Sequence, residues 1–273
     1  MVGERAETEF ARPRQLLPHE PPACPEGWVT GPPDFVGVGA QRCGTTWWHR
    51  QIVLHPRVTF EDGIHRKEVH CFDSLSGVDV LSPEQLELYA RYFPRPPSGQ
   101  IVGEWTPRYL LYPWVPKQLA QAAPRTRVLV LLRDPVDRYA SGVRWQSRLL
   151  DGSPAAGELT MEKIVRQQRR RGFYAEQIER LLEAFPREQV LILQYERCRD
   201  RYDEELERTY EFLGLDSTFR PPPDNRPEPT TGSGLPDAEG ADLARRYAAD
   251  VKRLIEIAPE IDASMWPNVR DLV

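Results

Sequence analysis

Three short apolar runs along the chain predict the strands of a buried sheet. Residues 34–38, 127–132 and 189–194 are rich in Val, Leu and Ile, and their apolar positions do not alternate with polar ones. Runs of this kind are typical of strands covered on both faces. A fourth, shorter strand is expected at residues 101–103.

Helical patterns separate and follow these runs. They cover residues 45–55, 115–123 and 164–185, and a last helix is expected at residues 239–258. Strands that alternate with helices favour crossover connections and parallel pairing. The predicted fold class is therefore α/β, with a central, mainly parallel β-sheet flanked by helices.

Proline marks the expected boundaries of the folded unit. Residues 1–33 hold seven prolines and predict an extended N-terminal arm, ahead of one α/β domain at residues 34–273. Residues 221–236 hold six more prolines. A connection this long and rich in breakers is often functional, so we expect a lid there.

Composition narrows the class of protein. The chain has 273 residues with 40% hydrophobic and 28% charged positions, as a globular protein has. A net charge of -5 argues against nucleic acid as a partner, and no apolar run is long enough to span a bilayer. The four cysteines form no C-x-x-C pair, which indicates neither a disulfide framework nor a zinc site and favours a cytoplasmic location. Nothing in the sequence indicates an oligomeric state.

A phosphate-binding loop is predicted between the first strand and the first helix. Residues 39–46 read G-A-Q-R-C-G-T-T. In this setting backbone N–H groups and the helix N-terminus can surround a phosphate, so the turn is P-loop-like. Thr45 stands where nucleoside triphosphatases have a phosphate-binding Lys, and the strand at 127–132 leads into Arg133 instead of a magnesium-binding Asp. We therefore expect a site that needs no metal.

A second anion site is predicted where the strand at 127–132 ends. Arg133 follows the strand, Pro135 suits the start of a helix, and Ser141 lies two turns into that helix. Ligands of open α/β sheets bind at the carboxyl ends of strands, so Arg133 is expected to face the same ligand as the loop. An ion pair of Arg133 with Asp134 or Asp137 is the alternative.

These two motifs, together with R-G-x-Y at residues 171–174, resemble the cofactor elements of sulfotransferases that use 3′-phosphoadenosine 5′-phosphosulfate (PAPS). The resemblance covers residues 34–215 and is greatest to the branch with the heparan sulfate sulfotransferase domains and related bacterial enzymes. It implies that the loop holds the 5′-phosphosulfate, that Arg133 and Ser141 hold the 3′-phosphate, and that Gly172 and Tyr174 lie near the cofactor. The implied loop residues are Arg42, Cys43, Gly44, Thr45 and Thr46.

The segment K-E-V-H-C-F-D at residues 67–73 resembles the K-E-x-H-F-F-D segment of the same family. The resemblance implies that Glu68 is the general base, a role worth about 10²- to 10⁴-fold in rate. His70 shares the Glu68 face of an extended segment and is the alternative base, or with Asp73 a contact to the acceptor. The non-catalytic alternative is a plain surface ion pair of Glu68 with Lys67 or Arg66, with His70 hydrogen-bonded on the surface.

Two departures from that branch bear on chemistry. Arg42 replaces a Lys, and an always-charged guanidinium stabilises a leaving group but does not donate a proton to it. Trp105 stands where the branch often has Lys, and we expect its indole to form an apolar wall of the acceptor site.

The sequence thus predicts an enzyme that moves a sulfuryl group from PAPS to a small-molecule or saccharide acceptor. A hydroxyl is the expected acceptor group and an amine the less favoured one, with Glu68 as base and Arg42 as the stabilising cation. The alternatives are a P-loop kinase or NTPase and a non-catalytic nucleotide-binding regulatory protein. The acceptor itself is not identified by the sequence.

Overall fold

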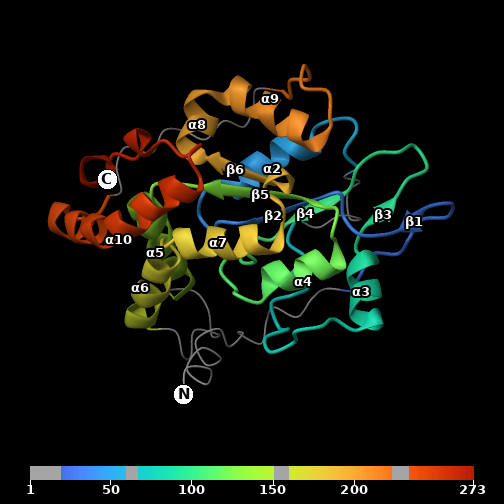
Figure 1. Ribbon diagram of the computed structural model, residues 1–273, viewed down its shortest axis with the longest axis horizontal. Coiled ribbons are helices and arrows are strands. Elements are labelled where there is room, and N and C mark those ends of the chain that lie inside the picture. The colour runs from blue at the N-terminus through green and yellow to red at the C-terminus, as the bar shows by residue number, and fades with distance from the viewer. Residues whose placement is uncertain (1–19, 60–66, 151–159, 223–233) are drawn as a thin grey trace.

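A four-stranded parallel sheet forms the centre of the computed structural model, which describes residues 20–59, 67–150, 160–222 and 234–273 (Figure 1). The strand order is β4-β2-β5-β6, and all three strand pairs are parallel. The strands are β2 (Phe35–Gly39), β4 (Gly103–Trp105), β5 (Arg127–Leu132) and β6 (Val190–Gln194). The predicted α/β class is confirmed.

Helices cover both faces of the sheet. Figure 1 shows α2 (Thr45–Val53), α8 (Tyr195–Asp200) and α9 (Tyr202–Leu213) on one side, with α4 (Val115–Ala122) and α7 (Ala175–Ala184) on the other. At one end of the sheet lie α5 (Pro135–Leu150), α6 (Met161–Arg170) and α10 (Asp237–Ile257), and near the other end lies α3 (Pro83–Ala90). Short 3-10 turns occur at Arg187–Gln189, Ala263–Met265 and Arg270–Leu272.

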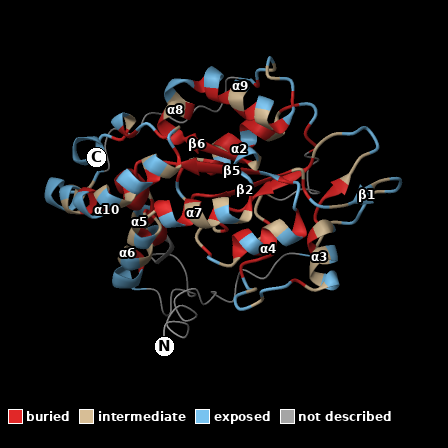
Figure 2. Ribbon diagram, viewed as in Figure 1, coloured by how far each residue is buried: buried red, intermediate tan, exposed pale blue. Residues whose placement is uncertain are grey.

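The core lies along the strands, which are coloured as buried in Figure 2. Residues 128–132 of β5 are each 0% exposed, as expected for a strand with a helical layer on both faces. Gly37 of β2 leaves room for a neighbour, because a Cβ atom there would lie 2.0 Å from Cδ2 of Trp105. The Trp105 indole can therefore pack against β2 only because residue 37 is Gly.

Two elements differ from the sequence prediction. The fourth strand begins at Gly103 and includes Trp105, whereas Ile101 makes only an isolated bridge with Val58. The stretch 164–185, predicted as helical throughout, is two helices that break between Arg171 and Tyr174. The break is stabilised from outside, because Asp250 of α10 accepts hydrogen bonds from the backbone N–H groups of Tyr174 and Ala175 and so caps α7.

Part of the predicted N-terminal arm lies within the described residues. There β1 (Val29–Thr30) pairs antiparallel with β3 (Pro94–Arg95), and Arg95 donates to Asp34 at 2.7 Å. Residues 1–19 of the arm and residues 223–233 of the predicted lid lie outside the described part, so the domain boundaries and the lid remain predictions. In the part of the chain that is described, no helix has both the length and the apolar character that crossing a membrane requires.

Candidate active site

The predicted phosphate loop joins β2 to α2 above the carboxyl end of the sheet. Ala40 donates its N–H to Leu131 of β5 at 2.9 Å, which fixes where the loop begins. Arg42 and Gly44 take left-handed φ angles of 69° and 87°. A Cβ atom on Gly44 would lie 2.7 Å from the ring of Tyr195, so the turn into α2 requires Gly for both conformation and space.

The N-terminus of α2 is open for an anion. Gly44 is its N-cap, no side chain caps it, and its first turn holds no acidic residue. A helix of nine residues presents free N–H groups and the positive end of its dipole at this point. The loop can therefore accommodate a phosphate group, and the binding of one by residues 42–46 stays a prediction.

Arg42 links the loop to the second motif. Its Nε donates to the hydroxyl of Ser141 on α5 at 3.3 Å, and its guanidinium lies over the ring of Trp145 with 5.6 Å between Cζ and the ring centroid. The structure thus brings together two residues that lie 99 positions apart. Trp145 was not foreseen, because an exposed Trp on a helix carries no motif of its own.

Arg133 lies at the carboxyl end of β5 as predicted. Its side chain ion-pairs with Asp137 at 3.6 Å, which is one of the two alternatives considered, and lies over the Tyr195 ring at 4.8 Å. Tyr174 fixes the backbone of Arg133, because the Tyr174 hydroxyl donates to the Arg133 carbonyl at 3.0 Å. Gly172 packs against Tyr247, where a Cβ would come within 2.7 Å of the ring.

Cys43 contributes its backbone to the loop, and its thiol points into the protein. The side chain is 0% exposed, and its Sγ lies 3.7 Å from the Tyr174 hydroxyl. Burial raises the pKa of the Cys43 thiol to about 11, so the thiol is neutral at physiological pH. A neutral buried thiol is a structural group here.

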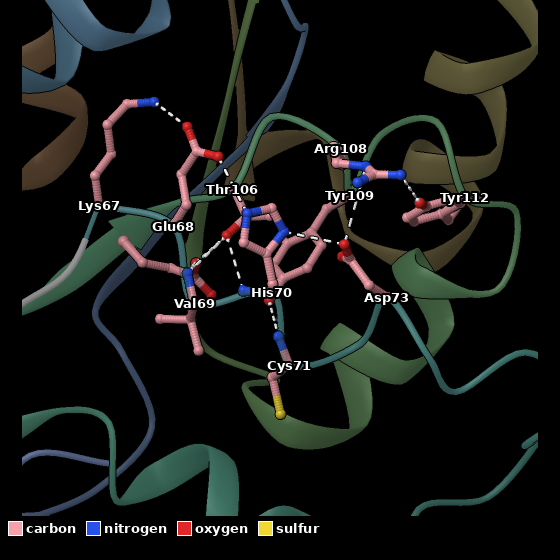
Figure 3. Close-up of polar contacts among 11 residues, drawn as sticks. Lys67, Glu68, Val69, His70, Cys71, Asp73, Thr106, Arg108, Tyr109 and Tyr112 are labelled. Carbon is pink, nitrogen blue, oxygen red and sulfur yellow. Dashed lines mark hydrogen bonds and ion pairs between the residues drawn. The ribbon is translucent and has the colours of Figure 1, made fainter. Parts of the chain in front are cut away.

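Glu68, His70 and Asp73 form one continuous row of contacts (Figure 3). Glu68 accepts from Lys67 at 2.9 Å, and its other oxygen lies 3.2 Å from Nε2 of His70. The Nδ1 atom of His70 lies 3.0 Å from the buried carboxylate of Asp73. The three predicted residues are therefore brought together, with the Lys67 pairing of the non-catalytic alternative also present.

The two neighbouring carboxylates decide the charge of His70. Burial alone lowers the pKa of His70, but the hydrogen bonds to Asp73 and Glu68 outweigh it and raise the pKa to about 9. For Glu68 the signs are reversed. Burial alone raises the pKa of this carboxyl group, but the hydrogen bonds from His70 and Lys67 outweigh it and bring the pKa down to about 2. At neutral pH the row holds an imidazolium between two carboxylates, so Glu68 rather than His70 has a lone pair free to accept a proton.

Glu104 of β4 holds this segment against the sheet and was missed from the sequence. Its carboxyl group is 0% exposed and accepts from the Val69 N–H at 3.1 Å, the Thr106 hydroxyl at 2.5 Å and the Tyr89 hydroxyl at 2.8 Å. The sequence feature that could have identified Glu104 is its position between the strand predicted at 101–103 and the Thr-Pro pair at 106–107. Its role is positional, since it contacts the backbone of the Glu68 segment.

The expectation for Trp105 was wrong. The indole is 0% exposed, and its Nε1 donates to the Gly39 carbonyl at 3.2 Å beneath the phosphate loop. Alternation along β4 explains this placement, because a side chain that fits against Gly37 of the neighbouring strand points into the helical layer and not toward solvent. Trp105 is a core residue and forms no wall of an acceptor site.

A family model described as the sulfotransferase domain matches residues 32–229 of the chain. The chain belongs to the sulfotransferase domain family. The match spans the phosphate loop, the row from Glu68 to Asp73, and Arg133 with Ser141. It gives no support to the kinase or NTPase alternative.

Individual relatives agree with this membership. Human bifunctional heparan sulfate N-deacetylase/N-sulfotransferase 2 is 27% identical over 201 residues, which are 67% of this chain and 22% of the relative. Human heparan sulfate glucosamine 3-O-sulfotransferase 6 is 28% identical over 189 residues, which are 67% of this chain and 52% of the relative. The chain thus spans between a fifth and about half of these relatives.

The fold is shared with a solved structure as well. The crystal structure of a sulfotransferase from Alicyclobacillus acidocaldarius superposes with a TM-score of 0.66 at 27% identity, covering 86% of this chain and 98% of that one. The sheet with its P-loop-like turn is therefore the sulfotransferase fold.

Proposed function

We propose that this protein transfers a sulfuryl group from PAPS to a hydroxyl or amine of an acceptor, with Glu68 as the general base. The observation that carries the proposal is the contact between Arg42 and Ser141, which joins the two predicted anion sites within a member of the sulfotransferase family. PAPS supplies the activated sulfuryl group when it is bound. The residues of this chain would bind it, position the acceptor and accept a proton.

The cofactor residues fit a nucleotide with phosphates at two positions. The N-terminus of α2 and Arg42 would form one anion site, and Arg133 would form the other with Ser141, whose hydroxyl accepts from Arg42. Preorganised donors of this kind stabilise negative charge that develops on a leaving phosphate, by about 10²- to 10³-fold per donor. Protein cations and N–H groups would thus do the work that a metal does in nucleoside triphosphatases, and the independence from metal remains a prediction.

The names of the relatives support one class of acceptor for the proposal. Both human relatives are named for heparan sulfate, which favours a saccharide as the acceptor here. The cytoplasmic location is a further part of the proposal, supported by four free cysteines of which three are buried.

Calorimetry with 3′-phosphoadenosine 5′-phosphate (PAP), the product that PAPS leaves behind, tests the proposal. PAP is expected to bind more tightly than 5′-AMP or ATP with magnesium. Arg133→Ala should weaken PAP about 10- to 100-fold and leave 5′-AMP nearly unchanged, because a charged hydrogen bond to the 3′-phosphate is lost. Arg148→Ala, at an exposed position of the same helix, is the matched control. Tighter binding of ATP with magnesium than of PAP would refute the proposal.

A further inference from the structure

Trp145 is a large aromatic residue beside the proposed donor site to which the reaction so far gives no role. Its side chain is 44% exposed, and it lies on α5 four positions after Ser141. Residues four positions apart share one face of a helix, so the indole and the Ser141 hydroxyl border the same space. Arg42 reaches both of them from the phosphate loop.

Two neutral groups contact the guanidinium group of Arg42. Its Nε atom donates to the Ser141 hydroxyl at 3.3 Å, and its Cζ atom lies 5.6 Å from the centroid of the Trp145 ring. Within the described ranges of the chain, no carboxylate forms an ion pair with Arg42. The face of an indole ring carries partial negative charge, so Trp145 attracts the cation without forming a hydrogen bond to it.

Other cations lie around Arg42. Burial lowers the pKa of Arg42, and the charges of Arg133, Arg144 and Arg138 lower it further. Arginine stays protonated at neutral pH nonetheless, so these three cations repel the guanidinium group. The attraction of the Trp145 ring opposes this repulsion and keeps the guanidinium beside Ser141.

An aromatic ring can restrain a cation and still leave it available to a ligand. A carboxylate would neutralise Arg42 and occupy its N–H groups, whereas a ring face leaves these groups unused. The hydrogen bond to Ser141 uses Nε, so it does not engage the two terminal nitrogens. A planar guanidinium also stacks on an indole better than a compact ammonium does, which matches the Arg that this chain has in place of Lys at position 42.

We propose that Trp145 is a positioning residue that holds the Arg42 guanidinium in place for the 5′-phosphosulfate of the donor. This inference rests on the proposed function, because it concerns the role of Arg42 in the same reaction. Trp145 acts on the donor through Arg42, so its effect requires both the Arg42 side chain and a phosphate at the 5′ position. Phe can replace Trp in part, because its ring face also attracts a cation.

A double-mutant cycle on nucleotide affinity tests this role. PAP and adenosine 3′-monophosphate (3′-AMP), which lacks the 5′-phosphate, are titrated by calorimetry into the full chain. Trp145→Ala is expected to weaken PAP about 5-fold, because Arg42 then has to be ordered when the nucleotide binds, and to leave 3′-AMP within about twofold of wild type. Trp145→Phe should recover most of the PAP affinity. In an Arg42→Ala background, Trp145→Ala should change PAP affinity by less than about twofold, because the partner of the ring is gone.

Met161→Ala is the matched control, because it removes another exposed apolar side chain beside α5 and should leave PAP affinity unchanged. Equal losses of PAP and 3′-AMP affinity in Trp145→Ala would mean that the ring contacts the nucleotide itself, which would overturn the inference. Unchanged PAP affinity in Trp145→Ala, or a loss of the same size in the Arg42→Ala background, would overturn it as well. A wild type that binds no PAP would instead refute the proposed function and this inference with it, so the two failures are distinguishable.

Discussion

At the residue scale, the ionisation of His70 determines what Glu68 can do. Two carboxylates hold the imidazolium, whose pKa is raised to about 9, and it in turn helps to keep Glu68 ionised. A carboxylate with a pKa of about 2 is a weak base while it remains fully paired. Its side chain is 39% exposed, so in the proposed reaction an acceptor hydroxyl would replace part of this pairing.

NMR titration of His70 tests this arrangement. The His70 ring is expected to titrate near pH 9, and Glu68→Gln should lower that pKa because one of the two stabilising carboxylates is gone. The imidazolium pairing stabilises the fold fully below the ordinary His pKa of about 6.5 and is lost as pH rises through about 9. His49 is an internal control, since burial lowers its pKa to about 3 and its signal should stay constant. A His70 midpoint at or below 6.5 in the wild type would contradict the contacts with Glu68 and Asp73.

At the element scale, the C-terminal segment holds the start of α5 in place. Trp266 is 0% exposed and donates from Nε1 to Glu196 at 2.8 Å, while Glu196 accepts from the Asp134 N–H at 3.0 Å. Asn268 donates to Asp134 from both its backbone and its side chain, each at 3.0 Å. Trp266 and Asn268 lie beyond residues 32–229, the part of the chain that the family model matches, yet Asn268 contacts the turn that carries Arg133 directly and Trp266 does so through Glu196.

Replacement of Asn268 by Ala tests whether this contact matters for the nucleotide. The side-chain amide also donates to Asp137 at 3.1 Å, and Asp137 is the ion-pair partner of Arg133. Without the amide, Asp137 is expected to hold Arg133 more strongly and compete with the 3′-phosphate. We expect PAP to bind about 3- to 10-fold more weakly by calorimetry, with a loss of about 1 kcal/mol in stability.

Ser264→Ala is the control for this experiment, because Ser264 hydrogen-bonds to Asp262 within the same turn and, among the described residues, to no residue of the α5 turn. Unchanged PAP affinity in Asn268→Ala, beside a measurable loss of stability, would restrict the C-terminal segment to a purely structural role.

At the scale of the whole molecule, the hydrophobic pattern of the sequence predicted which segments form the strands and helices, but it did not predict where single side chains lie. The strand at 127–132 has the predicted bounds, and the helix predicted at 45–55 is observed as Thr45–Val53. Trp105 and Glu104 could not be placed in the same way, since their surroundings come from Gly37, Tyr89 and Val69, which lie far apart in sequence. The break before α7 was missed for a related reason, because its cap Asp250 lies 76 positions after Tyr174.

Two buried glutamates contribute to the pH dependence of stability. Burial raises the pKa of both Glu104 and Glu196 to about 7, against hydrogen bonds that lower it. For such groups the folded state holds a proton that the unfolded state has already lost, so their stabilisation is complete below about pH 4.5 and disappears as pH rises through 7. Loss of the His70 charge acts in the same direction above pH 6.5, whereas the contribution of Glu68 is constant over this window.

Thermal unfolding should therefore show a stability that falls between about pH 5 and pH 9, by up to about 3 kcal/mol for each of the two glutamates. Glu104→Gln removes one titrating group; its single oxygen can accept from the Val69 N–H in place of Oε2, and its NH2 group can donate to the oxygen of the Tyr89 hydroxyl, which in the wild type donates to Oε1. The variant should show a shallower decline and a smaller difference from wild type at pH 9 than at pH 5. Glu84→Gln, at an exposed carboxyl, should leave the slope unchanged. A wild-type melting temperature that rises from pH 5 to pH 8 would mean that the hydrogen bonds at Glu104 and Glu196 outweigh their burial and keep both groups ionised.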